Sequence, residues 1–200
     1  NINSQGYRAN LENESLVNKI SCYGDSFTFA RQVNDNETWE YYLSKLTNTN
    51  VKNFGVGNYG LDQSLLRLKR EFLKNKSEIV ILGVVPDTIS RIVSVWKHYY
   101  EYGNTFGFKP RFYLKNNELC LFENIINSES KFSNYHLHLS KIQNLDFFYA
   151  KKFKKELLLF PYFISILKNP KRNILIIFWI FLSILFKFFR KNTSTIEYKA

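Results

Sequence analysis

The stretch KISCYGDSFT, residues 19–28, decides the fold of this chain. Its first half, Lys19–Tyr23, is a short apolar run of the kind that forms a buried strand in a parallel sheet. The strand enters a tight turn at Gly24-Asp25-Ser26, and a helix is expected to follow. This turn therefore presents a serine at the carboxyl end of the first predicted strand.

Helical and extended segments alternate on the C-terminal side of this turn. A helix is predicted over residues 35–46, then a strand at 51–56 and an amphipathic helix at 61–75. Residues 78–85 (EIVILGVV) form the clearest strand, which is apolar on both faces, and a helix follows it through about Tyr100. Because such alternation builds a parallel sheet with helices on both faces, we predict an α/β fold, three-layered and flavodoxin-like.

The ends of the three strands are expected to form one site. In an open parallel sheet the ligand binds beyond the carboxyl ends of the strands, where the turns 24–29, 55–60 and 83–89 would meet. The backbone N–H of Ser26 and the start of its helix are suited to stabilise an oxyanion. The second glycine of a G-x-S-x-G elbow is missing, and the alternative is that Ser26 only caps the following helix.

Three blocks of sequence together resemble the SGNH/GDSL hydrolase family of bacterial esterases and acyl hydrolases. They are Ser26 with its turn, Asn53–Gly60 and Gly83–Asp87, and they span about residues 19–90. The stretch Asn3–Arg8 (NSQGYR) is similar to the segment that precedes the first block in many bacterial members. The resemblance implies that Ser26 is the nucleophile, that blocks two and three donate to the oxyanion, and that a late D-x-x-H completes the site.

Two positions depart from the family pattern. Asn58 stands where the second block has its donor glycine, but it retains the backbone N–H, and asparagine tolerates positive φ. Asp87 stands where the third block has a donor asparagine, and an ionised carboxylate cannot donate a hydrogen bond. The other role expected for Asp87 is to cap the next helix. The residues expected to support the site are Gly24, Asp25, Gly57 and Gly60.

The base that would activate Ser26 is not identified in this sequence. The three histidines are His98, His136 and His138, and none of them has an aspartate three residues earlier. We expect the catalytic histidine and aspartate to lie beyond Ala200, so that the chain is incomplete at its C-terminus. The alternatives are a relative without catalytic activity and a base supplied by His136 or His138.

The second block also spells G-x-G-x-x-G, the pyrophosphate turn of dinucleotide-binding folds. Asp87, at the end of the next strand, offers a partner for a ribose. Against this interpretation, the strand before the turn is short and half polar, and it is not the first strand of its unit. Dinucleotide binding is therefore a remote alternative, and we expect no cofactor.

Positive charge is concentrated toward the C-terminus. The formal net charge is +11, and residues 141–200 carry +9 of it, from 12 Lys/Arg against 3 Asp/Glu. Basic residues flank the apolar run Ile174–Phe186, which favours an anionic membrane over nucleic acid as a partner. Because the run is short for a spanning helix, we expect an interfacial or re-entrant helix and hence membrane association. The alternatives are a helix packed against protein and a true span.

The chain is expected to divide into four segments: an SGNH-like core at 1–100, an insertion with a hairpin and a polar, aromatic stretch at 101–156, an apolar helical segment with basic flanks at 157–191, and the start of a further element at 192–200.

The expected function is hydrolysis of an acyl or acetyl ester on a glycan or a lipid. The alternatives are an acyltransferase of the same fold that modifies a cell-surface polysaccharide, and a membrane-associated relative without catalytic activity. Cys22 and Cys120 are expected to be free thiols, and the sequence has no cysteine or histidine cluster with metal-ligand spacing.

Overall fold

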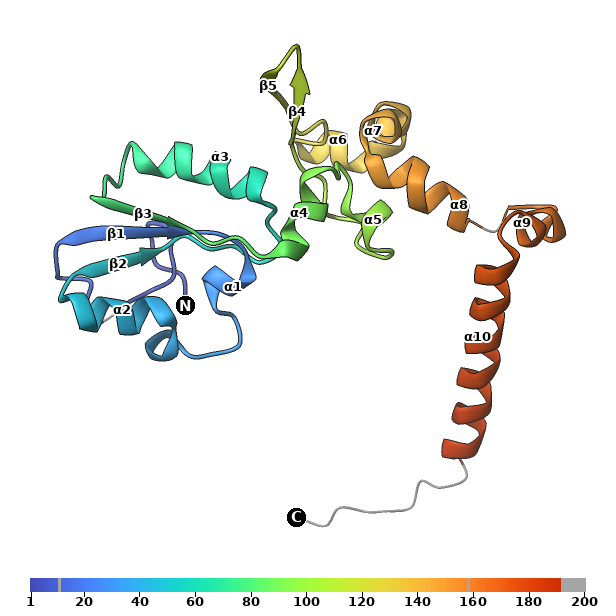
Figure 1. Cartoon of the computed structure of the whole chain (residues 1–200), viewed down its shortest axis with the longest axis horizontal. Coiled ribbons are helices and arrows are strands. Elements are labelled where there is room, and N and C mark those ends of the chain that lie inside the picture. The colour runs from blue at the N-terminus through green and yellow to red at the C-terminus, as the bar shows by residue number, and fades with distance from the viewer. Residues whose placement is uncertain (11, 158, 192–200) are drawn as a thin grey trace. The chain divides into compact units, whose positions relative to one another are not determined.

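A computed structural model describes residues 1–10, 12–157 and 159–191, and Figure 1 shows its elements. The chain divides into two compact units, Asn1–Lys152 and Phe153–Ala200. The first unit holds the sheet and all three sequence blocks. The segment expected to begin a further element, residues 192–200, lies outside the described residues.

The first unit is built on a three-stranded parallel sheet. Its strands are β1 (Asn18–Tyr23), β2 (Asn50–Asn53) and β3 (Ile79–Leu82), and their order is β2-β1-β3. Both neighbours run parallel to β1. The prediction of an α/β fold with a parallel sheet is therefore confirmed, and the strand that leads to Ser26 is the central one.

Helices lie on both sides of this sheet, with α2 on one side and α3 on the other (Figure 1). Thr38 caps α2 by accepting a hydrogen bond from the N–H of Tyr41 at 3.1 Å. The helices of this part are α1 (Ser26–Phe29), α2 (Trp39–Thr47), α3 (Leu61–Phe72), α4 (Pro86–Ile92) and α5 (Lys97–Tyr100), with a short 3-10 turn at Asp35–Glu37 before α2.

Two small clusters of apolar side chains form the core around β1. On one face Ile20, Cys22 and Val51 pack together. On the other, the rings of Tyr23 and Phe54 stack with their centroids 5.0 Å apart. Cys22 and Cys120 are both free thiols, as expected, and burial raises the pKa of the Cys22 thiol. The Cys22 thiol is therefore a packing group and not a nucleophile.

The apolar stripe of α2 is covered only in part, because Leu43 packs against the core while three of its other members face outward. Trp39, Tyr42 and Leu46 are exposed, with 85% of Leu46 accessible, while Glu40 and Ser44 are buried. The Ser44 hydroxyl accepts hydrogen bonds from the Asn10 amide and from the Val51 N–H. The Ser44 hydroxyl therefore finds partners beneath α2, while Leu43 packs against the core cluster of Ile20, Cys22 and Val51.

The strand that was clearest in the sequence, β3, is an edge strand of the described sheet. Among the described residues β3 pairs with β1 alone, and 52% of Ile79 and 38% of Val80 are exposed. An apolar run shows that a strand can be buried on both faces, but not that neighbours are present to bury it.

Beyond α5 the first unit contains a hairpin and short helices. The hairpin pairs β4 (Arg111–Lys115) with β5 (Glu118–Phe122), as predicted. Its turn residues Asn116 and Asn117 have φ of 51° and 61°, the conformation that two-residue hairpins favour. The short helices are α6 (Glu129–Ser133), a 3-10 turn at Tyr135–His138, α7 (Leu139–Leu145) and a π-helical turn at Tyr149–Phe153.

The second unit consists of helices. They are α8 (Lys154–Glu156), α9 (Tyr162–Lys168) and α10 (Pro170–Lys191). The side chains of Ile174, Trp179 and Phe186 on α10 are more than half exposed. Within the described residues, no helix has the length and apolar character needed to cross a membrane.

Candidate active site

Ser26 is the first residue of α1 and follows the central strand after a two-residue turn. The helix cap is Asp25, not Ser26, because the Asp25 carboxylate accepts a hydrogen bond from the Phe27 N–H at 2.9 Å. The interpretation of Ser26 as a simple helix cap is therefore wrong. The Ser26 side chain is half-buried, and capping does not use its hydroxyl.

Glycines that follow all three strands allow α1 to pack directly on the sheet. A Cβ atom at Gly24 would lie 2.0 Å from the Thr28 Oγ1, and one at Gly83 would lie 2.2 Å from the same atom. From β2, a Cβ at Gly55 would lie 2.4 Å from the Phe29 nitrogen. Only glycine fits these close approaches.

Backbone hydrogen bonds join the three predicted turns. The Val56 N–H donates to the Gly24 carbonyl at 3.0 Å, and the Gly83 N–H donates to the Tyr23 carbonyl at 2.8 Å. The structure thus brings the turns that follow β1, β2 and β3 together around α1.

The turn after β2 contains a residue in the left-handed backbone conformation. Asn58 is exposed and has a φ of 68°, a left-handed conformation that asparagine adopts more readily than most residues. Its backbone N–H makes no hydrogen bond within the described residues. Gly57 has open space around it, whereas a Cβ at Gly60 would lie 2.5 Å from the Asp62 Oδ1. Gly60 is therefore needed for packing, and Gly57 is not.

The first asparagine of the second block holds α1 in place. The side-chain amide of Asn53 donates to the Thr28 carbonyl at 2.7 Å, and its Oδ1 accepts from the Gly55 N–H at 2.9 Å. This buried side chain therefore ties the end of β2 to the helix that carries Ser26.

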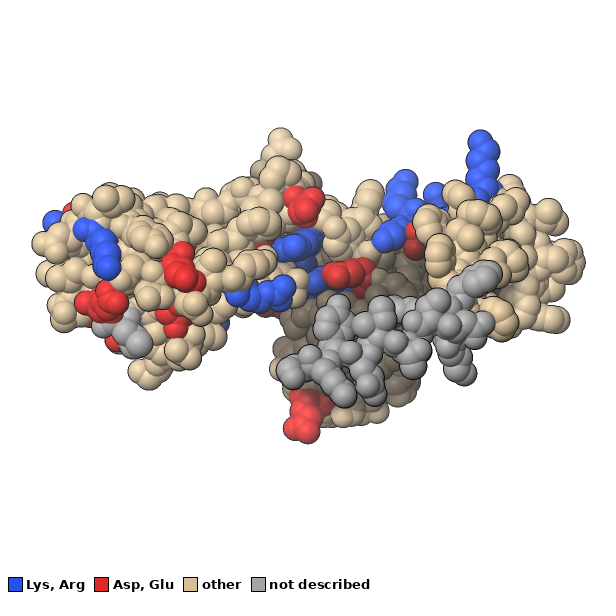
Figure 2. All heavy atoms as spheres, turned by 90° about the horizontal axis from the view of Figure 1, so that it is seen from below, with Lys and Arg blue, Asp and Glu red and all other residues tan. Residues whose placement is uncertain are grey.

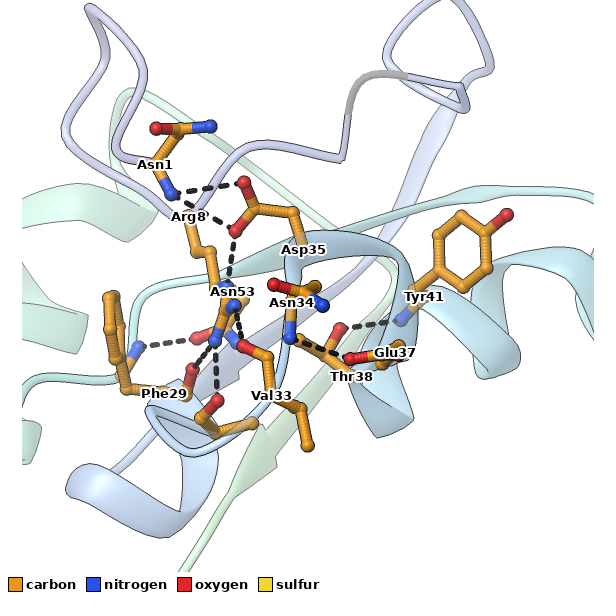
Figure 3. A network of polar contacts seen from close by, with 12 residues as sticks. Asn1, Arg8, Phe29, Val33, Asn34, Asp35, Glu37, Thr38, Tyr41 and Asn53 are labelled. Atoms are coloured by element: carbon orange, nitrogen blue, oxygen red, sulfur yellow. Dashed lines mark hydrogen bonds and ion pairs between the residues drawn. The ribbon is translucent and has the colours of Figure 1, made fainter. Parts of the chain in front are cut away.

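Arg8 braces the other end of α1 (Figure 3). Its buried guanidinium donates to the carbonyls of Phe29, Ala30 and Val33, each at 2.6 Å, and pairs with Asp35 at 2.7 Å. The segment Asn3–Arg8, singled out by the resemblance alone, thus supports the serine-bearing helix from behind.

Asp87 lies at the second residue of α4 and is exposed. The cap position of α4 is Val85, and no side chain makes the capping hydrogen bond, so the expectation that Asp87 caps this helix is wrong. One turn further on, Arg91 donates to the Tyr59 carbonyl at 2.9 Å and lies 3.6 Å from the Asp25 Oδ2. From the helix that continues the third block, Arg91 therefore contacts the first and the second block, a role that the sequence did not indicate.

The histidines are used elsewhere. His98 Nδ1 accepts a hydrogen bond from the Gly103 N–H at 3.2 Å, and burial lowers the pKa of its imidazole. His136 and His138 lie in the 3-10 turn Tyr135–His138. Neither of them belongs to the strands or turns that surround Ser26. No group of three or more potential metal ligands occurs in the part of the chain that the structure describes.

The site thus combines three features: Ser26, which does not act as the helix cap; Asn58, whose N–H makes no hydrogen bond within the described residues; and a third block that ends in the carboxylate of Asp87. No protein-family model, curated protein or solved structure matches this chain.

Proposed function

We propose that this chain carries the nucleophile and the oxyanion turn of a serine ester hydrolase of SGNH type with a flavodoxin-like sheet. The observation that carries the proposal is the position of Ser26. It stands where three strand ends meet, on a helix whose cap is the neighbouring Asp25. A serine at the carboxyl edge of a parallel sheet, whose hydroxyl makes no hydrogen bond within the described residues, is suited to nucleophilic chemistry.

The proposed reaction is a two-step acyl transfer. The Ser26 Oγ attacks the ester carbonyl carbon and gives its proton to a base. The backbone N–H groups of Ser26 and Asn58 donate to the oxygen that becomes negative. The alcohol then leaves with a proton from the base, and water releases the acyl group from Ser26. Since α1 has only one turn, we assign the stabilisation to these N–H groups and not to a helix dipole.

We assign the base to none of the three histidines, because His98, His136 and His138 do not make up a D-x-x-H. If a sugar hydroxyl replaces water in the second step, the same site is an acyltransferase that modifies a polysaccharide. A relative without catalytic activity would retain the fold but not the serine chemistry.

The substrate proposed is an acylated glycan or lipid near a membrane. The support for this location is α10, whose apolar side chains are exposed and which has Lys171 and Arg172 in its first turn. Basic residues beside an exposed apolar helix favour contact with anionic lipid through residues 157–191.

The test is ester hydrolysis by the natural full-length protein. We expect acetate release from acetylated sugars or from p-nitrophenyl acetate, and loss of that release in Ser26→Ala. A Ser26→Ala variant that folds and retains the wild-type rate would overturn the proposal.

A further inference from the structure

A pocket of about 250 Å³ adjoins the turn that carries Asn58. Its walls come from the turn 57–59, from Gln63 at the start of α3, from the segment 91–100 and from the loop 104–109. Ser26 is not among its lining residues. All of these walls belong to the first unit, so the pocket is built within one compact body.

Buried polar contacts hold the walls of the pocket in place. The carboxylate of Asp146, which follows α7, accepts hydrogen bonds from the N–H groups of Val95 and Trp96 at 2.6 and 3.0 Å. The same carboxylate accepts from the hydroxyl of Ser94, which lines the pocket. Because Asp146 is almost fully buried, these bonds fix the wall that follows α4.

The pocket lining is cationic. Arg91, Lys97 and Lys109 line it, and no aspartate or glutamate does. Each cation has a carboxylate partner that does not itself line the pocket. Asp25 lies 3.6 Å from Arg91, Glu101 lies 2.8 Å from Lys97, and Asp62 contacts Lys109. Figure 2 likewise shows Lys and Arg side chains lying next to Asp and Glu side chains.

Two of the three cations are able to bind a ligand as well. Lys109 is enclosed by Asp62 and by the Pro110 carbonyl, and it is buried. Lys97 meets Glu101, whose side chain is 58% exposed, so water screens that pair. Arg91 directs one nitrogen to the Tyr59 carbonyl, and its guanidinium has further N–H donors. An anion in the pocket would therefore meet Lys97 and Arg91.

The rest of the lining suits a sugar ring. Side-chain amides of Asn58, Gln63 and Asn104 offer both donors and acceptors, which match hydroxyl groups. The rings of Tyr100 and Phe108 add flat apolar surface, and Phe108 is held by stacking on Trp96 at a centroid distance of 5.0 Å. Sites for small ligands typically combine apolar surface with a few such polar groups.

We propose that this pocket binds an anionic sugar, a ring that carries a carboxylate or a phosphate group. The sugar would be the alcohol portion of the ester substrate, and this part of the inference rests on the proposed function. The pocket and the serine site share two residues: Asn58 contributes to both, and Arg91 lies beside Asp25, the residue before Ser26. A sugar bound here would thus lie next to the proposed oxyanion turn.

The test is a titration followed by NMR chemical shifts, with the Ser26→Ala protein so that no ester chemistry enters. The probes are D-glucuronate, D-glucose 6-phosphate and neutral D-glucose at low ionic strength. We expect at least one anion to bind about tenfold more tightly than glucose, through the charge-assisted contacts. Whichever anion binds more tightly identifies the charged group. Equal binding of all three probes, or no binding, overturns the proposal.

Three charge variants test the pocket itself. Lys97→Gln should weaken binding of the anion about fivefold, because it removes a cation that attracts the anion. Glu101→Gln should strengthen binding about twofold, because it removes the carboxylate that competes with the anion for Lys97. The matched control is Lys115→Gln, an exposed lysine of the hairpin that does not line the pocket. Equal losses in Lys97→Gln and Lys115→Gln, or weaker binding in Glu101→Gln, overturn the assignment. Sugar binding by a wild-type protein that hydrolyses no ester would refute the proposed function and leave this site standing.

Discussion

Glu40 lies in an environment that opposes its charge. Its side chain is 1% exposed, and neither carboxylate oxygen makes a well-formed hydrogen bond among the described residues. It borders a cavity of about 10 Å³ whose lining includes Arg8 and Asn53. Burial raises the pKa of this carboxyl to about 8, although Arg8, Thr38 and Asn53 partly oppose the rise. Glu40 is therefore largely protonated at neutral pH.

Stability should fall as the pH rises through this range. Because the pKa of Glu40 is higher in the folded chain than the ordinary value of 4.5, the folded state binds a proton that the unfolded state has released. Protonated Glu40 contributes on the order of 4 kcal/mol to the free energy of unfolding below about pH 4.5. This contribution is lost as the pH rises to about 8. Urea unfolding at pH 5, 6.5 and 8 should show Glu40→Gln gaining stability over the wild type as pH rises. Parallel pH dependence of the two proteins would contradict this.

The carboxylate of Asp87 should hinder the proposed reaction. It stands where the resemblance places a donor asparagine, and it would repel an oxyanion held nearby. Asp87→Asn removes that charge and supplies a donor, so kcat/KM for an acetyl ester should rise by about tenfold. Asp87→Ala, which removes the charge without adding a donor, should give a smaller gain. A lower rate in Asp87→Asn would show that the carboxylate takes part in the reaction.

Some residues of the site follow from the sequence and others do not. The turn at Ser26 and the left-handed Asn58 were predictable, because both are set by the chain next to them. Arg8 and Arg91 were not predictable as braces, since their partners lie far away in the sequence. Contacts between residues far apart in the chain leave no pattern in the sequence around either residue.

At the scale of elements, α1 is held by contacts with its neighbours and not by its own length. It has four residues, too few to be stable alone, and it depends on close packing against the ends of the strands. A Cβ at Gly83 would overlap the Thr28 Oγ1, whereas a Cβ at Gly24 would overlap both the Oγ1 and, at 2.8 Å, the Cβ of Thr28.

These distances predict which glycine substitution can be rescued. Gly83→Ala and Gly24→Ala should each cost about 2 kcal/mol or more in unfolding free energy. Adding Thr28→Ala should restore most of the loss at Gly83, where the Thr28 Cβ is 3.6 Å away, but not at Gly24. Denaturant titration of the two single and two double variants measures this. Equal rescue at both glycines would refute the packing account.

The exposure of α2 and β3 shows where periodicity fails as a predictor. The positions of both elements were predicted closely, because caps, turn residues and apolar runs are local signals. Which face is covered depends on other elements. Tyr42 and Ile79 are exposed because, within the described residues, no element covers them.

At the scale of the whole molecule, the two units differ in charge and in apolar exposure. The proposed membrane contact predicts that the full chain binds anionic vesicles more tightly than neutral ones, and less tightly at high salt. Trp179→Gln should lower the partition coefficient about tenfold, because Trp179 is 67% exposed on α10. Trp39→Gln, which alters an exposed tryptophan of α2, is the control and should have no effect. Equal effects of both variants in vesicle sedimentation would contradict the assignment.

The central claim, that Ser26 is a nucleophile, is tested most directly by covalent labelling. The natural full-length protein is treated with a fluorophosphonate, and the adduct is mapped by peptide mass spectrometry. We predict a single adduct on the peptide that contains Ser26, absent from Ser26→Ala. No adduct in a folded protein, or an adduct that persists in Ser26→Ala, would contradict the account.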